Sequence, residues 1–177
     1  MNNSRIAWLA APALAAAACA HAEAPAADDL PALVECRAGG VAAYNALAME
    51  LTGSGRAAAL KRLGMREAKS ANPFLAEYRL AQPITVFGRT TSHVAFNSAG
   101  VLAVLDEADP HPLAAQLGVT AAVDRPGKYL GEKLVSEIEE EISEGVKLTA
   151  TTTLNVSTVD SHPGKVLAGC GYRMETE

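Results

Sequence analysis

Asp160, Ser161 and His162 bring together the three residue types of a hydrolytic triad, in which an acid orients a histidine that activates a serine. They are consecutive in the chain, so we expect their side chains to diverge, and the Pro-Gly pair that follows them is typical of a tight turn. The other histidines of the predicted mature chain, His93 and His111, lie in no recognisable acid/base arrangement. We interpret the segment as a turn, His93 as a half-exposed strand residue, and the protein as a non-enzyme without catalytic residues.

Cys36 and Cys170 form the second group with chemical potential, either as a nucleophile beside a histidine or as a disulfide. The sequence places no base or orienting group beside either thiol. Both cysteines belong to the part of the chain that we expect to be exported, where paired cysteines are usually oxidised. We therefore predict a Cys36–Cys170 disulfide that joins the start of the fold to its last strand.

Acidic residues gather at two places that we considered as cation sites. Asp106, Glu107, Asp109 and His111 lie close together, but a strand end followed by a capped helix accounts for these acids, and the spacing of metal ligands is absent. The second group contains five glutamates between residues 137 and 144, and they lack the spacing of the acidic ligands in a calcium loop. We interpret this group as a solvated acidic edge of the sheet that opposes aggregation. We expect no metal and no cofactor. The second group consists of Glu137, Glu139, Glu140, Glu141 and Glu144.

Residues 1–22 have the features of a cleaved signal peptide. Arg5 precedes an Ala/Leu-rich run at residues 6–18, and Ala20-His21-Ala22 fits the small-x-small cleavage pattern. The run is shorter than the roughly 20 residues that span a bilayer. An alternative is a lipoprotein signal, because small residues precede Cys19. We expect a periplasmic or secreted protein, or alternatively one that is lipid-anchored in the cell envelope; it contacts a membrane only if Cys19 is lipidated.

Removal of the leader leaves 155 residues, enough for one domain with a single core. We assign residues 23–32 to a flexible tether, rich in alanine and acidic residues, and residues 33–177 to the domain. The net charge of −5 becomes −6 once Arg5 is lost with the leader. Because the basic residues are scattered rather than clustered, this charge argues against binding to nucleic acid.

The C-terminal part predicts a β-hairpin. Apolar and polar residues alternate along 146–157 and again along 166–174, and the turn lies between them. If the strands pair across this turn, the numbers of paired residues sum to 324. That register sets Leu154 opposite Cys170 and Thr152 opposite Tyr172, with Cys170 on the buried face.

The first half of the domain predicts two helices followed by three strands. The helices cover residues 41–52 and 56–63 and are separated by a Gly-Ser-Gly linker. Strand patterns follow at 78–86, 94–96 and 101–105, and the last is a nearly continuous apolar run typical of a central strand. A further short helix starts after an Asp109 cap and ends at Gly118.

Two short matches at offsets of 54 and 55 residues suggest an internal repeat. Residues 63–68 match 117–122, and residues 74–77 match 129–132. The repeat units would be 41–107 and 108–177, each a helix followed by three strands. This alignment favours a strand for residues 129–139, with a helix as the alternative because apolar residues recur every four positions from Leu130 to Ile142.

These elements predict an α+β domain with an antiparallel sheet of about six strands packed against helices. One face of the C-terminal hairpin is polar, uncharged and nearly flat, and such a face can bind a partner protein. The tandem arrangement resembles the architecture of secreted β-lactamase-inhibitor-type proteins, and this resemblance implies that an enzyme is gripped by the sheet face. The predicted contact residues are Thr149, Thr151, Thr153, Asn155, Gly169 and Gly171.

The sequence therefore favours an exported, non-catalytic binding or inhibitory module whose partner protein is unknown. An envelope lipoprotein subunit anchored through Cys19 is the first alternative, supported by the cysteine and the tether. A small hydrolase is the second alternative, and the lack of a catalytic cluster in the sequence disfavours it.

Overall fold

The computed structural model of this chain describes residues 29–37 and 39–176. The predicted signal peptide, Cys19 and residues 23–28 of the predicted tether lie outside the described residues. The described part is an α+β fold with four helices and one eight-stranded antiparallel sheet. None of its helices is long and apolar enough to cross a membrane.

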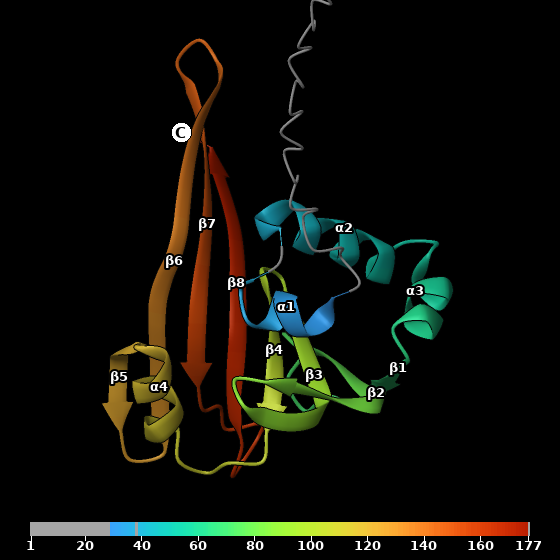
Figure 1. The fold of residues 1–177 in the computed structure, drawn as a ribbon, viewed down its shortest axis with the longest axis vertical. Coiled ribbons are helices and arrows are strands. Elements are labelled where there is room, and N and C mark those ends of the chain that lie inside the picture. The colour runs from blue at the N-terminus through green and yellow to red at the C-terminus, as the bar shows by residue number, and fades with distance from the viewer. Residues whose placement is uncertain (1–28, 38, 177) are drawn as a thin grey trace, which may run out of the picture.

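The sheet has the strand order β1-β2-β3-β4-β8-β7-β6-β5 (Figure 1). The first four strands of the chain form one half, the last four form the other, and β4 meets β8 at the centre. The predicted number of about six strands is too low, because β1 and β5 are short edge strands with few buried side chains. The strands are β1 (Met65–Ala68), β2 (Ala76–Val86), β3 (Arg89–Asn97), β4 (Gly100–Leu105), β5 (Thr120–Arg125), β6 (Lys128–Ser143), β7 (Val146–Ser157) and β8 (Val166–Thr176).

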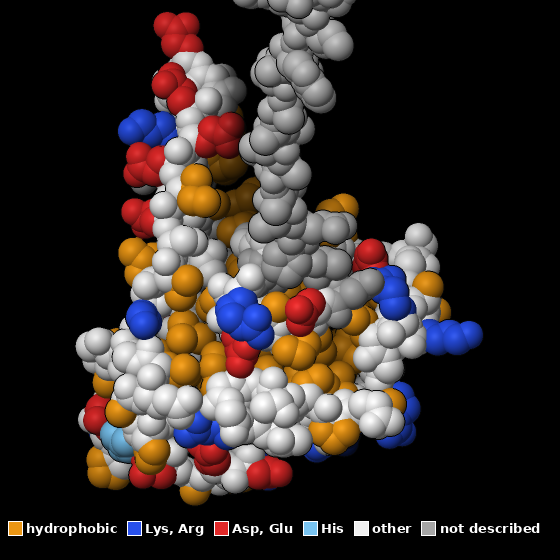
Figure 2. Space-filling model, viewed as in Figure 1, with side chains coloured by type: hydrophobic (Ala, Val, Ile, Leu, Met, Phe, Trp, Pro, Cys, Tyr) orange, Lys and Arg blue, Asp and Glu red, His pale blue; other side chains and the backbone are white. Residues whose placement is uncertain are grey.

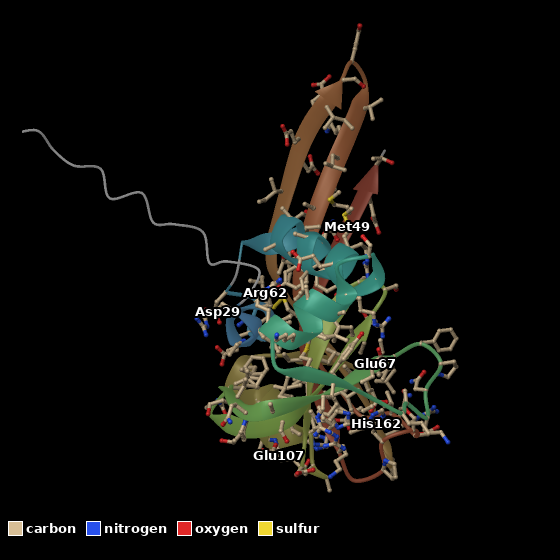
Figure 3. The ribbon with its side chains drawn as sticks, turned by 90° about the vertical axis from the view of Figure 1, so that its right-hand side faces the viewer. Asp29, Met49, Arg62, Glu67, Glu107 and His162 are labelled. Carbon is tan, nitrogen blue, oxygen red and sulfur yellow. A yellow bond between two sulfur atoms is a disulfide. The ribbon has the colours of Figure 1, made fainter. Side chains whose placement is uncertain are left out.

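The helices are α1 (Leu30–Val34), α2 (Gly40–Thr52), α3 (Arg56–Arg62) and α4 (His111–Leu117). The two predicted N-terminal helices are confirmed as α2 and α3, and α4 ends at Gly118, as predicted. The N-cap of α4 is Pro110 and not the predicted Asp109, whose carboxylate accepts from the N–H of His111. Residues 30–32 of the predicted tether lie in α1. We call the side of the sheet that α1 and α2 cover the helix face and the opposite side the outer face (Figures 1 and 3).

The predicted disulfide joins Cys36, just after α1, to Cys170 on β8, with 5.2 Å between the two Cα atoms. Cys36 has a φ of 57°, the left-handed conformation that commonly ends a helix. The N–H groups of Cys36 and Arg37 donate to the carbonyl oxygens of Leu33 and Ala32, which completes this end. The disulfide therefore attaches the last turn of α1 directly to the central part of the sheet.

The C-terminal hairpin has the predicted register. Leu154 pairs with Cys170 and Thr152 pairs with Tyr172. Leu154 and Tyr172 are buried in the core on the helix face, where the Tyr172 hydroxyl donates to Leu33 O at 2.7 Å. Alternation along β7 then places its odd-numbered residues on the outer face.

Residues 128–143 form a strand, as we predicted for residues 129–139, although their apolar residues recur every four positions. Four is an even number, so such a spacing also keeps side chains on one face of a strand. A bulge between Leu134 and Ser136 then changes the face. Leu134 pairs with Thr153 of the outer face, whereas Ile138 pairs with Ala150 beside the helix face.

Each half of the sheet follows one helix in the chain, in the orders α3-β1-β2-β3-β4 and α4-β5-β6-β7-β8. The predicted unit of one helix and three strands therefore lacks one strand in each half. Equal element order is a property of the topology and does not itself show a sequence repeat.

Candidate functional site

Four of the six predicted contact residues line one hollow on the outer face. These are Thr151, Thr153 and Asn155 of β7 and Gly171 of β8, and the hollow has a volume of about 340 Å³. Thr149 lies further along β7 and does not line it. The structure thus brings most of the predicted surface together at the middle of the sheet.

Gly171 keeps the floor of this hollow open. A Cβ atom built on it would lie 2.8 Å from Thr153 Oγ1 and 3.0 Å from Asn155 Nδ2. The Asn155 amide in turn donates to Thr153 Oγ1 at 3.1 Å and to the Thr153 carbonyl oxygen at 3.2 Å. The glycine therefore gives room to a hydrogen-bonded Thr-Asn pair whose orientation is fixed within its own strand.

Gly169 has a different role from the predicted one. It is buried, so it offers no contact surface, and a Cβ atom there would collide with the carbonyl oxygen of Val101 on β4. The missing side chain allows the close approach of β4 and β8. Gly169 lies on the outer face, as predicted, but it is buried and so cannot be a contact residue.

The lining of the hollow is mostly uncharged. Leu102 and Leu130 supply apolar wall, and Glu132 and Arg173 are the charged residues among those that line it. Hydroxyl and amide groups can pair with polar groups of a ligand, and uncharged groups of this kind cost less to desolvate than ions do. The hollow therefore suits a polar, uncharged group presented by a partner.

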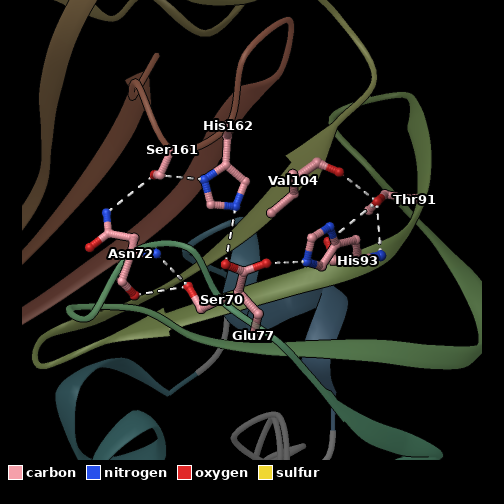
Figure 4. Close-up of polar contacts among 8 residues, drawn as sticks. All are labelled: Ser70, Asn72, Glu77, Thr91, His93, Val104, Ser161 and His162. Atoms are coloured by element: carbon pink, nitrogen blue, oxygen red, sulfur yellow. Dashed lines mark hydrogen bonds and ion pairs between the residues drawn. The ribbon is translucent and has the colours of Figure 1, made fainter.

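A second cluster, which we call the Glu77 network, lies on the outer face and was not foreseen (Figure 4). Glu77 on β2 is buried, and His93 Nε2 on β3 lies 2.7 Å from its Oε2 atom. His162, in the turn between β7 and β8, places Nε2 3.2 Å from Oε1. Among the described residues Oε1 has no well-oriented hydrogen-bond donor, so this contact is chiefly electrostatic. Two histidines from distant segments thus converge on one carboxylate.

The network continues to the surface through Ser161. Its Oγ atom lies 3.0 Å from His162 Nδ1, and Asn72 Nδ2 donates to the same Oγ at 3.4 Å. The expectation that Ser161 and His162 diverge is therefore wrong. The acid of this chain of contacts is Glu77 and not Asp160, which is exposed.

The electrostatics of the network favour an ionised Glu77 beside a neutral His93. Burial raises the pKa of Glu77, but the Ser70 hydroxyl, the electrostatic contact with His162 and the hydrogen bond with His93 outweigh burial, and the pKa is lowered. Burial and the neighbouring Arg79 guanidinium lower the pKa of His93 despite the contact with Glu77. A neutral His93 then donates its Nε2 proton to the carboxylate.

His93 is buried, so the prediction of a half-exposed strand residue is wrong. The pairing of β2 with β3 explains part of this site. Arg79 pairs with His93, and Glu77 is the next residue of β2 on the same face of the sheet. His162 reaches this site only because β8 pairs with β4, a pairing between distant parts of the chain.

The acids near α4 form ordinary surface pairs. His111 Nδ1 lies 2.6 Å from Asp109, and His111 Nε2 lies 3.1 Å from Asp124, both at the rim of a cleft of about 860 Å³ that also contacts His162. Asp106 pairs with Lys165, and Glu107 pairs with Arg89. Residues 29–37 and 39–176 contain no group of three potential ligands that could hold a metal ion.

No family model, curated protein or solved structure matches the chain, so neither a family nor a relative assigns a role to the hollow or to the Glu77 network.

Proposed function

We propose that this protein is an exported, non-catalytic binding module that holds a partner protein against the outer face of its sheet. The observation that carries the proposal is the hollow of about 340 Å³, which unites Thr151, Thr153, Asn155 and Gly171. A partner residue with an amide or hydroxyl group can enter it and exchange water for hydrogen bonds with these side chains. The exposed side chains of the neighbouring strands would then supply the rest of the contact.

The disulfide supports the exported location, because such bonds persist in oxidising compartments and are rare in the reducing cytosol. It also ties α1 to β8 behind the hollow, through Cys170, which is a neighbour of Gly171. A periplasmic or secreted module is the first form of the proposal. A lipoprotein anchored at Cys19 is the alternative form and would present the same sheet face.

The test is a paired capture experiment with two double variants. T151R/T153R fills the hollow with two long cationic side chains, whereas A57R/A58R adds the same charge to exposed positions of α3. We expect wild type and A57R/A58R to capture the same partner from an envelope extract and T151R/T153R to lose it, with all three showing the same thermal unfolding. Equal capture by T151R/T153R would contradict the proposal.

Hydrolysis is a second candidate function, favoured by the contacts that link Ser161, His162 and Glu77. A serine hydroxyl beside an imidazole that is itself in contact with a buried carboxylate has the connectivity needed to activate a nucleophile. Asn72 Nδ2 donates to Ser161 Oγ and helps to hold this hydroxyl in place.

A fluorophosphonate reagent separates this candidate from the binding function. An activated Ser161 would attack the phosphorus, displace fluoride and keep the phosphonyl group, which intact-mass measurement detects. The variant S161A should abolish that labelling, and H162Q should slow it while the fold persists. Absence of labelling in the wild-type protein would exclude the hydrolase and leave the binding module unaffected.

A further inference from the structure

The hairpin of β6 and β7 extends as an arm beyond the helices, and we define the arm as residues 133–151 (Figures 1 and 3). In Figure 3 its tip lies at the end of the molecule opposite to His162. β6 pairs with β5 only up to Glu132. Along residues 133–143 it has β7 on one side, and no strand of the described part of the chain lies on the other. This free edge is about 35 Å long at the usual rise per residue.

A free edge presents backbone N–H and C=O groups that can pair with a further strand. The arm also exposes large apolar side chains. The exposed fraction is 56% for Leu134, 62% for Ile138 and 53% for Ile142. Val135, Val146 and Met174 are exposed as well. These apolar side chains lie on both faces of the arm, and exposed apolar surface along an unpaired strand gains free energy when it is covered.

The charges of the arm select what can cover it. The arm carries five exposed glutamates but only two lysines, Lys133 and Lys147. Figure 2 shows acidic side chains along this part of the molecule. The glutamates are Glu137, Glu139, Glu140, Glu141 and Glu144. A strand added beside β6 would therefore meet a strongly negative edge, which favours basic side chains in that strand.

Register divides most of the requirement between the two faces; Glu140 is the exception, since it pairs with Leu148 on the side of Ile138. Glu137 and Glu139 pair with Thr151 and Thr149 and so lie on the outer face, whereas Ile138 between them points to the other side. An added strand alternates in the same way. Its residues beside the glutamates are best basic, and its residues beside Ile138 are best apolar.

A second copy of this chain fits the edge poorly. Two β6 edges placed side by side would bring both sets of glutamates together, and like charges on neighbouring strands are destabilising. We propose that the arm binds an extended segment of another protein, with alternating basic and apolar residues, as an additional strand along residues 133–143. The site is the free edge of β6, whereas the hollow lies on the outer face of the sheet, and the proposal does not depend on the function proposed for the hollow.

The probe is a fluorescein-labelled peptide of about eight residues in which lysine and valine alternate, long enough to cover most of the edge. One control peptide alternates glutamate with valine, and another alternates lysine with serine. A third control peptide has the lysine-valine sequence with a methyl group on the backbone nitrogen of every second residue. It therefore lacks the N–H groups that an added strand donates to its neighbour. We expect the full chain to bind the lysine-valine peptide at least about tenfold more tightly than each control, with weaker binding in high salt.

Two charge variants test the location of the site. E137K/E139K/E141K reverses the edge and should transfer the preference to the glutamate-valine peptide. The matched variant E67K/D106K/D160K changes the net charge equally at exposed positions outside the arm and should bind as the wild type does. Thermal unfolding of both variants verifies that the fold is retained.

Several results overturn the proposal. These are equal binding of the lysine-valine and glutamate-valine peptides, full binding of the N-methylated peptide, and loss of binding in the matched variant. Sedimentation equilibrium that shows a dimer broken by I138S would assign the arm to a second copy. Co-sedimentation of the arm with phosphatidylglycerol vesicles, abolished by I138S/I142S, would assign it to a lipid surface.

Discussion

His162 Nε2 lies 3.2 Å from Oε1 of Glu77, so the turn between β7 and β8 is tied to β2 across β8, β4 and β3. His93 holds the other carboxylate oxygen from β3, at 2.7 Å. One buried acid therefore joins the β2–β3 hairpin to a turn that is far away in the chain. The contact with His162 holds the β7–β8 turn beside β2.

Acidification should destabilise the fold through this network. Because the pKa of His93 is lowered from 6.5, the unfolded chain takes up a proton before the folded chain does, and stability is lost as the pH falls below that value. The pKa of Glu77 is also lowered, from 4.5, so its contribution is lost in the same direction at lower pH. Urea denaturation between about pH 7 and pH 4 should show a falling free energy of unfolding.

Two histidine variants with opposite effects check this assignment. H93Q removes the histidine whose pKa is lowered. The free energy of unfolding should therefore fall less between about pH 7 and pH 5 than it does in the wild type. The contacts with Asp109 and Asp124 raise the pKa of His111, so its contribution is present at low pH and is lost as the pH rises. H111Q should therefore make the loss on acidification steeper, by a small amount because the site is exposed. A profile unchanged in H93Q would contradict the role of His93.

The fold was predictable where local pattern and pairing agreed. The β7–β8 register follows from the alternation of both strands and the turn between them, and Leu154 faces Cys170 as expected. The edge strands β1 and β5 escaped prediction because an edge strand buries few side chains and so need not alternate. The period-four spacing of β6 remained ambiguous until the alignment of the halves favoured a strand.

The candidate site was predictable only in part, for a topological reason. Thr151, Thr153 and Asn155 come from one strand, so their common face follows from alternation alone. Glu77 and His162 come from opposite halves of the sheet, and their contact requires the long-range pairing of β4 with β8. No local pattern encodes that pairing, and so the sequence suggested a simple turn at His162.

Export can be tested by measuring the intact mass of the protein recovered from the cell-envelope fraction. Arg5, the apolar run and Ala20-His21-Ala22 predict a mature chain that starts at Glu23, whereas a lipoprotein would start at a lipidated Cys19. The variant C19S should lose membrane association only in the second case. Recovery of the full-length chain from the cytoplasm would contradict both routes.

Loss of the disulfide should lower the free energy of unfolding by about 2–5 kcal/mol, since the bond closes a long loop. The variant C36S/C170S measures this in urea, and alkylation of the unreduced, denatured wild type should label neither cysteine. The left-handed φ of 57° at residue 36 costs a non-glycine residue about 1 kcal/mol. C36G/C170S should therefore recover about that amount relative to C36S/C170S, and equal stability of the two variants would show that α1 ends differently without the bond.

Gly169→Ala should destabilise the protein strongly, because its Cβ atom would collide with the backbone of Val101 and Leu102 on β4 and neither strand can yield at the centre of the sheet. We expect a loss of about 2–4 kcal/mol, as for other overpacked interior positions. Gly55→Ala is the matched control, since a Cβ atom there lies 4.0 Å from its nearest neighbour and φ is −78°. Its effect should stay within about 1 kcal/mol. Similar unfolding midpoints for the two variants would mean that β4 and β8 separate more easily than their close approach implies.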